Sequence, residues 1–262
     1  MPTHSKNSIS YYTFSVFDEF NLTHGVFMRR GGCSPKPWKS LNMATSVGDD
    51  RLSVIENRRR ITDVLSLQQD SIYDVWQVHS NEVISTDKSR PIDTPHIKAD
   101  AIITNNPNVT LLMLFADCVP ILFFDPENCA AAVAHAGWQG TLKGVVVETV
   151  DVMQKTYKTN PAKLIVGIGP SICMQHYEVG KEMEEKFINV FDSEDKILNY
   201  YQGKTFLDLK KANEILLSRI GVKTVFNSNI CTSCNPNDWF SHRAENGQTG
   251  RFAAVMTVKK QK

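Results

Sequence analysis

The chain has 262 residues, a formal net charge of +1 and 42% hydrophobic residues. This near-neutral balance gives no indication of a nucleic-acid or membrane-surface partner, and the length allows a full hydrophobic core. No apolar run approaches the roughly 20 residues that span a bilayer, and residues 1–10 lack the apolar segment of a secretory signal. We therefore expect a cytoplasmic protein whose six cysteines form no disulfide framework.

Up to residue 104, predicted strands alternate with loops, and one helix is predicted. Residues 1–10 are expected to be a disordered start. A helix is predicted over residues 52–67, because apolar residues recur on one side and Asp49 or Asp50 can cap its first turn. Strands are predicted at residues 11–17, 24–28, 72–78, 83–85 and 99–104.

Two long apolar runs form the centre of the chain. The first begins at residue 111 and ends on Cys118, after which apolar residues continue to residue 124. The second covers residues 130–134 and ends on His135. Such runs indicate buried strands. Further helices are predicted at 141–157, 180–190 and 208–220, and further strands at 163–169, 222–226 and 252–258. No repeat or linker divides the chain, so we expect one α/β domain over residues 11–262, with mixed strands inside and helices outside.

Three side chains that can bind a metal end predicted strands, namely His79, Cys118 and His135. Imidazole and thiolate are good zinc ligands. Three protein ligands with one open position make the catalytic form of a zinc site, in which bound water becomes a nucleophile near neutral pH. The alternative interpretation is three unrelated residues near turns, since the long spacing does not show that they meet.

Cys118 and His135 alone allow a second hypothesis. A thiolate activated by a neighbouring histidine is a nucleophile for acyl transfer, and the amides around Gly137 could supply an oxyanion hole. His79 separates the two hypotheses, because a three-ligand site needs it and a dyad does not.

Other motifs carry less information. Cys231 and Cys234 have C-x-x-C spacing, but no second pair accompanies them, so we interpret them as two ordinary thiols. No Walker sequence, dinucleotide fingerprint or nucleobase-deaminase signature occurs. The seven histidines include no His-x-His pair, which argues against a multicopper oxidase. Arg243 and Arg251 are compatible with anion binding or with a solvated loop.

Two motifs are highly specific, Ala-Asp-Cys-Val-Pro at residues 116–120 and His-Ala-Gly-Trp at residues 135–138. Supporting segments include residues 29–32, 48–50, 77–79, 99–101 and 249–251. With these motifs the chain, from about residue 14 to residue 258, resembles the laccase-domain or polyphenol oxidase proteins. This family includes the bacterial YfiH-type proteins and the C-terminal part of mammalian FAMIN.

The resemblance implies a zinc ion, or alternatively copper, held by His79, Cys118 and His135. It implies layered mixed β-sheets with outer helices, a fold shared with Cys–His toxin deamidases. The implied activity is phosphorolysis of adenosine, inosine and methylthioadenosine, together with adenosine deamination, by a monomer or homodimer whose partners are a nucleoside and phosphate. Alternatives in the family are a Cys–His amidase that hydrolyses UDP-muramoyl–amino acid precursors and a copper-dependent polyphenol oxidase.

Roles for other residues follow from the same resemblance. Asn42 is expected to hydrogen-bond the nucleoside, and Arg243 or Arg29 to position phosphate. Asp117 and Glu178 are candidate general acids, although Asp117 could instead orient a metal ligand.

Four residues depart from the family pattern beside the expected pocket. Ser80 stands where glycine is common, Gln139 where arginine or lysine is common, Cys173 where glycine is frequent and His242 where tyrosine is usual. These departures affect the expected substrate preference and leave the three metal ligands unchanged.

Overall fold

The most apolar part of the chain lies at the centre of the structure as two paired strands. The computed structural model describes residues 3–20 and 22–259. In it, β8 (Val119–Asp125) and β9 (Ala130–Ala136) pair antiparallel, with Pro120 opposite His135. Every residue of both strands is buried. Because both faces of the pair are covered, the sequence shows continuous apolar runs rather than alternation.

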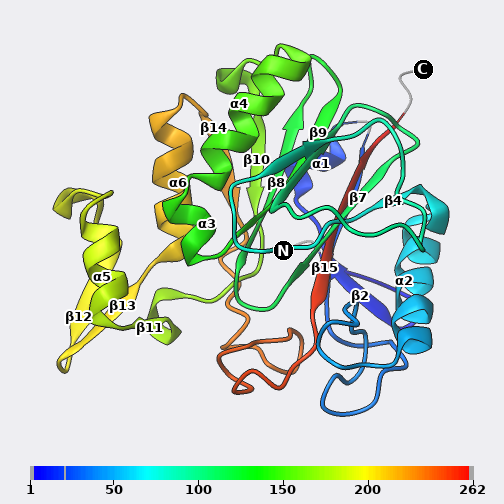
Figure 1. Ribbon diagram of the computed structural model, residues 1–262, viewed down its shortest axis with the longest axis horizontal. Helices are drawn as coiled ribbons and strands as arrows, with labels where there is room; N and C mark the ends of the chain where they lie inside the picture. The colour runs from blue at the N-terminus through cyan, green and yellow to red at the C-terminus, as the bar shows by residue number, and fades with distance from the viewer. Residues whose placement is uncertain (1–2, 21, 260–262) are drawn as a thin grey trace.

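Two six-stranded mixed sheets make up the body of the domain (Figure 1). The strand order of the first sheet is β1 (Thr3–Lys6), β2 (Ile9–Tyr12), β3 (Leu22–Phe27), β15 (Phe252–Val258), β7 (Thr110–Phe115) and β4 (Ile72–Tyr73). The order of the second sheet is β14 (Thr224–Asn227), β10 (Ile165–Ile168), β8, β9, β6 (Ala101–Thr104) and β5 (Val83–Ser85).

The two large sheets face each other, and helices cover their outer faces. β9 contacts β15 and β7 of the first sheet, and the shared core includes Met113, Leu122 and Val133. The second sheet is covered by α3 (Trp138–Leu142), α4 (Val145–Tyr157) and α6 (Leu209–Arg219), whereas α2 (Arg51–Leu65) covers the first. The predicted fold class, an α/β domain of layered mixed sheets with outer helices, is confirmed.

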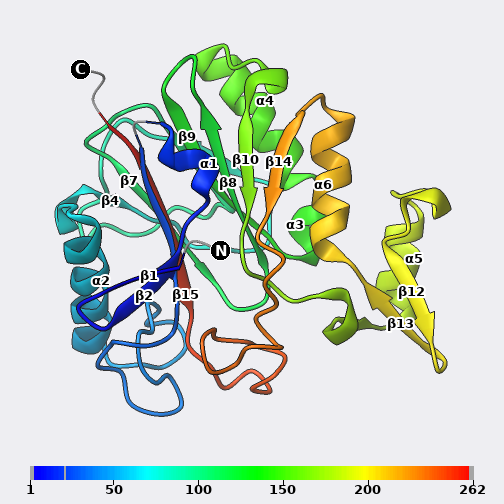
Figure 2. The same ribbon diagram turned by 180° about the vertical axis from the view of Figure 1, so that it is seen from behind.

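A small antiparallel sheet projects from the side of the domain next to α6 (Figure 2). It consists of β11 (Glu178–Val179), β13 (Lys204–Leu207) and β12 (Leu198–Tyr201), and α5 (Lys181–Ile188) packs beside it. The sequence predicts no strand here, because β12 is mostly exposed and lacks an apolar run.

Two predicted helices illustrate what local sequence determines. The predicted helix 52–67 is α2, and the Asp50 side chain caps it by accepting a hydrogen bond from the Ser53 amide at 2.8 Å. The predicted helix 141–157 is interrupted at Gly144, whose φ of +77° separates α3 from α4. A left-handed residue cannot continue a right-handed helix, so the chain turns there.

The N-terminal prediction is wrong for the residues that the structure describes. Residues 3–12 form the hairpin β1–β2, and residues 1–2 of the predicted disordered start lie outside the described residues. β1 pairs with β2, and Tyr11 and Tyr12 of β2 pair with β3. Hydrogen bonds to neighbouring strands therefore order this backbone, although its sequence is polar. The predicted strand 11–17 ends at Tyr12 and is followed by the short helix α1 (Ser15–Asp18).

His24 on β3 is buried against α1. Its Nε2 accepts a hydrogen bond from the Phe14 amide at 2.8 Å, and its ring meets Phe17 edge to face. Burial, with the nearby charge of His4, lowers the pKa of His24 from 6.5 to about 3. The unfolded chain therefore binds more protons than the folded one between these two pKa values, and the free energy of unfolding falls as the pH falls through this window.

We expect protonation of His24 to lower the free energy of unfolding by about 2 kcal/mol when the pH falls from 7 to 5. Urea unfolding at both pH values measures this, with His24→Gln as the comparison because its amide can accept a hydrogen bond but does not titrate. The pH-dependent loss should shrink by about that amount in the variant. An equal loss in both proteins would contradict the assignment of the titration to His24.

Candidate metal centre

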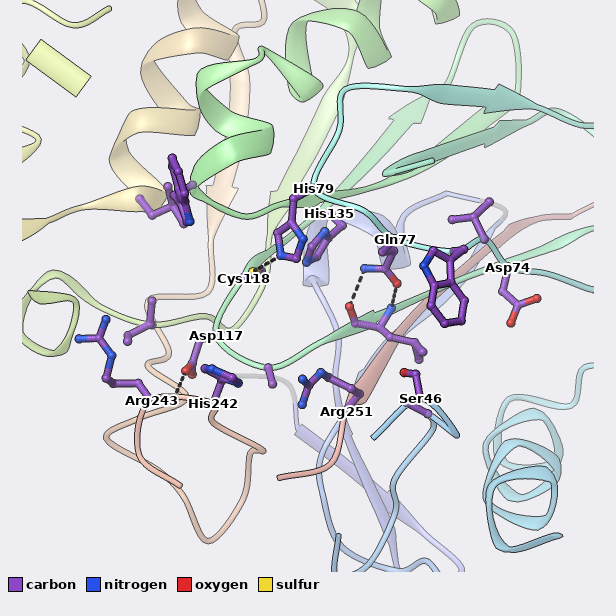
Figure 3. Close-up of a pocket in the computed structure, with 18 of the residues that line it drawn as sticks. Ser46, Asp74, Gln77, His79, Asp117, Cys118, His135, His242, Arg243 and Arg251 are labelled. Carbon is purple, nitrogen blue, oxygen red and sulfur yellow. Dashed lines mark hydrogen bonds between the residues drawn. The ribbon is translucent and has the colours of Figure 1, made fainter. Parts of the chain in front are cut away.

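The tertiary structure brings His79, Cys118 and His135 together. His79 lies in the loop between β4 and β5, Cys118 directly precedes β8, and His135 lies on β9. Each offers one ligand atom, and the three atoms lie within 4.8 Å of one another. The Cys118 Sγ and His79 Nε2 atoms are 4.0 Å apart (Figure 3). The β8–β9 register explains the meeting of Cys118 and His135, since Val119 is opposite Ala136.

The backbone around the cluster adopts conformations that few residues tolerate. His79 has a φ of +58° and Asp117 a φ of +80°, both in the left-handed region. A Cβ atom on Gly137 would lie 2.8 Å from His79 Cδ2 and 3.0 Å from Cys118 Sγ. The glycine of the His-Ala-Gly-Trp motif is therefore needed for the cluster to close.

Asp100, just before β6, orients the His135 imidazole and holds the backbone on both sides of His79. Its Oδ1 accepts a hydrogen bond from His135 Nδ1 at 2.8 Å, which turns the other ring nitrogen toward Cys118. Its Oδ2 accepts three more, from the Val78 amide at 3.1 Å and from the Ser80 amide and hydroxyl at 2.6 and 2.8 Å. The residues on both sides of His79 are thus fixed to the carboxylate that holds His135.

Ionisation in the cluster prepares Cys118 as a metal ligand but keeps a proton on His135. Burial alone would raise the pKa of Cys118, but the charge of His135 and hydrogen bonds with both histidines lower it to about 6. Burial alone would lower the pKa of His135, but Cys118 and Asp100 raise it to about 9. Without a metal, the pair is therefore a thiolate and an imidazolium near neutral pH. The thiolate is the ligand form of cysteine, whereas His135 must release its proton when a metal binds.

The cluster opens into a pocket of ≈ 600 Å³. Its wall carries three guanidinium groups, those of Arg58, Arg243 and Arg251. It also carries aromatic side chains, among them Trp76, which is 50% exposed. Pockets of roughly 300–1,000 Å³ with a few convergent polar groups are typical small-molecule sites.

Two arginines of the wall are held by backbone carbonyls. Arg251 Nη1 donates to the Thr249 and Gly250 carbonyls at 3.2 and 3.0 Å. Arg243 donates through Nη1 and Nη2 to the carbonyls of His176 and Glu178, both at 3.0 Å. In the view of Figure 3, Arg251 lies between His242 and Ser46, below the ligand cluster.

Two residues expected to bind substrate lie elsewhere. Asn42 is fully buried and is already hydrogen-bonded to Ala44, Asp49 and the Arg251 amide. Arg29 pairs with Glu245 at 2.9 Å. Neither lines the pocket. In their place the structure offers Arg251, which the sequence indicated only as one of two arginines near the last strand.

Asp117 lines the pocket, but its carboxylate is already engaged. Oδ1 accepts a hydrogen bond from the Thr232 hydroxyl and Oδ2 one from the Arg243 amide, each at 2.6 Å. Asp117 thus ties the Cys118 turn to the loop that carries Arg243. The other candidate acid, Glu178, pairs with Lys204 at 2.8 Å and does not line the pocket.

The four departures from the family pattern have different surroundings. Ser80 hydrogen-bonds Asp100, and His242 lines the pocket. Gln139 lies on α3 and is not part of the pocket wall. Cys173 lies next to His176, with their Sγ and Nδ1 atoms 3.3 Å apart. Only His242 therefore reaches the space that a substrate would occupy.

The chemistry of the donors fits a divalent metal. One sulfur and two imidazole nitrogens suit zinc or copper, and three protein ligands leave a position open toward the pocket. Asp100 supplies the carboxylate–histidine contact that usually supports such ligands.

Among the described residues, no helix is long and apolar enough to cross a membrane.

Comparison with known proteins extends over nearly the whole chain. A family model described as multi-copper polyphenol oxidoreductase laccase matches residues 23–259. Purine nucleoside phosphorylase YlmD of Bacillus subtilis (strain 168) is 34% identical over 244 residues, which cover 90% of this chain and 88% of that protein. Purine nucleoside phosphorylase LACC1 of Mus musculus is 34% identical over 231 residues, covering 85% of this chain and 52% of that protein.

Solved structures agree with these relationships. The crystal structure of Bacillus licheniformis hypothetical protein YfiH has a TM-score of 0.91 at 31% identity and covers 98% of this chain and 99% of that chain. YlmD from Geobacillus stearothermophilus has a TM-score of 0.90 at 30% identity, with 98% of both chains covered. The resemblance inferred from the sequence motifs is confirmed, and the chain belongs to the multi-copper polyphenol oxidoreductase laccase family.

Proposed function

We propose that this protein is a metal-dependent purine nucleoside phosphorylase that acts on adenosine, inosine and methylthioadenosine and also deaminates adenosine. The observation that carries the proposal is the meeting of His79, Cys118 and His135 in a pocket whose wall also holds guanidinium groups. The relatives named purine nucleoside phosphorylase support the reaction class. The pocket has room for a nucleoside with phosphate.

Zinc is the metal proposed for this site, with copper as the alternative. A bound divalent metal supplies a Lewis acid and lowers the pKa of water. The family description names multi-copper oxidation, and a multicopper centre needs many imidazoles. The cluster formed by the described residues His79, Cys118 and His135 contains two. We therefore place nucleoside chemistry ahead of polyphenol oxidation.

Phosphorolysis transfers the ribosyl group from a base to phosphate. A phosphate oxygen bonds to C1′ while the C1′–N9 bond breaks, and the purine leaves with the bonding electrons and takes up a proton. Arg251 and Arg243 supply positive charge for the phosphate. The bidentate contact falls to Arg251, since both Nη atoms of Arg243 donate to backbone carbonyls. Trp76 offers an exposed aromatic face for the purine. Asp117 positions the Arg243 loop.

The direct test is product analysis with purified, zinc-loaded protein. Inosine with inorganic phosphate should give hypoxanthine and ribose 1-phosphate, and base release should require phosphate. Adenosine should give adenine, and also inosine if the deaminase part is right. Chromatography of the products separates these results. Absence of base release with zinc or copper would reject the proposed phosphorylase, whatever happens to adenosine.

A pair of arginine variants tests the phosphate subsite. Arg251→Gln should raise the KM for phosphate by about tenfold or more, because a charge-assisted bidentate contact is lost. Arg51→Gln is the matched control, since Arg51 is on α2, pairs with Asp93 and does not line the pocket. Equal KM values in both variants would remove Arg251 from the subsite.

A second candidate function is supported by the ion pair in the same site. Cys118, His135 and Asp100 form a chain of nucleophile, base and orienting carboxylate, which is the arrangement of a Cys–His hydrolase. Its substrate would be an amide such as a UDP-muramoyl–amino acid precursor. This activity would survive chelation of metal and would be lost on alkylation of Cys118.

A further inference from the structure

A second cluster of metal-binding side chains lies outside the site described above. It consists of Cys173, His176, Cys231 and Cys234, whose ligand atoms all lie within 4.8 Å of one another. Cys173 directly precedes the short 3₁₀ turn Met174–His176, and His176 is its last residue. The two other cysteines follow β14. The second pair that the C-x-x-C spacing lacked in sequence is therefore a Cys-x-x-His pair. Cys231 and Cys234, interpreted from the sequence as two ordinary thiols, lie beside this pair in the structure.

The distances in this Cys–His cluster match a tetrahedral metal site. Zinc bonds of roughly 2.3 Å to sulfur and 2.0–2.1 Å to nitrogen place tetrahedral ligands about 3.8 Å apart for two sulfurs and about 3.6 Å apart for sulfur and nitrogen. His176 Nδ1 lies 3.3 Å from Cys173 Sγ, 3.4 Å from Cys234 Sγ and 4.0 Å from Cys231 Sγ. The Cys173 and Cys234 sulfurs are 4.0 Å apart.

Backbone amides also point at one of the sulfurs. Cys231 Sγ accepts hydrogen bonds from the Cys173 amide at 3.2 Å and from the Cys234 amide at 3.4 Å. Such bonds favour the charged form of an acceptor, here the thiolate that binds metal. The first amide comes from the opposite segment, so the backbone holds both halves of the cluster in place.

We propose that Cys173, His176, Cys231 and Cys234 bind a structural zinc ion. Three sulfurs and one imidazole form a complete tetrahedral set, as in closed structural sites, whereas the pocket cluster has three ligands and an open side. Cys231 is buried while His176 and Cys234 are exposed, so the site lies at the surface where an ion can enter. The inference does not depend on the proposed reaction.

The position of the Cys–His cluster indicates what its zinc does. It joins the segment that supplies Ile172 and Tyr177 to the pocket wall to the segment of Cys231 and Cys234, and the two are already bridged between Ser171 and Cys231. The segment of Cys173 also contacts the pocket site twice. Its Ile172 amide donates to the Asp117 carbonyl at 3.0 Å, and its His176 carbonyl accepts a hydrogen bond from Arg243. Zinc would therefore fix the wall that carries Ile172, Tyr177 and Arg243.

The test uses the full chain with the pocket cluster disabled. Cys118→Ser, expressed with zinc and dialysed, should retain about one zinc ion per chain by mass spectrometry of the metal. Adding Cys234→Ala or His176→Ala should lower zinc affinity at least about tenfold, because a direct ligand is lost. Both residues are exposed, so circular dichroism should show folded protein. Replacing zinc by cobalt should give the thiolate charge-transfer absorption of a tetrahedral site.

Cys33→Ser in the same background is the control, since Cys33 is an exposed thiol outside both clusters. It should leave the zinc content unchanged. Folded Cys118→Ser protein without zinc, or zinc that persists unchanged in the Cys234→Ala variant, would overturn the proposal. So would a Cys173–Cys234 disulfide in protein purified without reductant, if reduction then restores no zinc binding.

Discussion

His79→Ala and Cys118→Ser are each expected to reduce phosphorolysis by about 10³-fold or more. Each removes one of the three donors around the proposed metal, and a bound metal contributes several kcal/mol of transition-state stabilisation. Metal content should fall together with kcat/KM. Both quantities are measured on the same protein preparation. Activity is the rate of base release, and the zinc bound at the Cys–His cluster is subtracted from the total metal content.

His79→Ala is the more informative of the two variants, because only the three-ligand site needs this imidazole. A Cys118–His135 hydrolase would keep most of its activity in His79→Ala and would resist chelators, whereas Cys118→Ser would inactivate either enzyme. Cys33→Ser controls for loss of a thiol away from the pocket and should behave as wild type. Full activity of metal-free His79→Ala would reject a metal-dependent reaction.

Asp100→Asn is expected to lower metal affinity by about 10–100-fold, although Asp100 itself is not a proposed ligand. The Asp100 carboxylate accepts four hydrogen bonds, which come from His135, Val78 and Ser80. An amide NH₂ group would face one of these N–H donors, leaving a buried donor without an acceptor at a cost of about 1–3 kcal/mol. Activity should fall at limiting zinc and recover in part with excess zinc.

Two further variants serve as comparison and control for Asp100→Asn. Ser80→Ala removes one hydrogen bond to Asp100 and should have a smaller effect on zinc affinity than Asp100→Asn. Asp93→Asn is the control for loss of a carboxylate, since the Asp93 side chain is 84% exposed and pairs with Arg51 alone among the described residues. Unchanged zinc affinity in Asp100→Asn would show that the imidazoles hold their positions without this carboxylate.

The proposed zinc at the Cys–His cluster changes how the pocket variants should be read. Arg243 contacts both His176 and Asp117, so loss of that zinc would also disturb the phosphate side of the pocket. Metal depletion of the wild-type protein then removes two functions together. The Cys118→Ser background separates them, because it leaves the Cys–His cluster intact.

The sequence by itself determined the features that depend on local pattern or on side-chain chemistry. The apolar runs predicted the buried strands β8 and β9, and Asp50 predicted the start of α2. His79, Cys118 and His135 were identified from the chemistry of their donor atoms and their places at strand ends.

Only the tertiary structure decided which distant residues meet. It placed Asp100 against the His135 imidazole and brought His176 next to Cys231 across 55 positions. It also put Arg251 in the pocket wall, where Asn42 and Arg29 were expected to act. It also paired residues 3–6 with β2, although they carry no apolar signal. The physical reason is the same in each case: hydrophobic periodicity records whether a side chain is buried, whereas contact between distant segments depends on strand register and sheet packing.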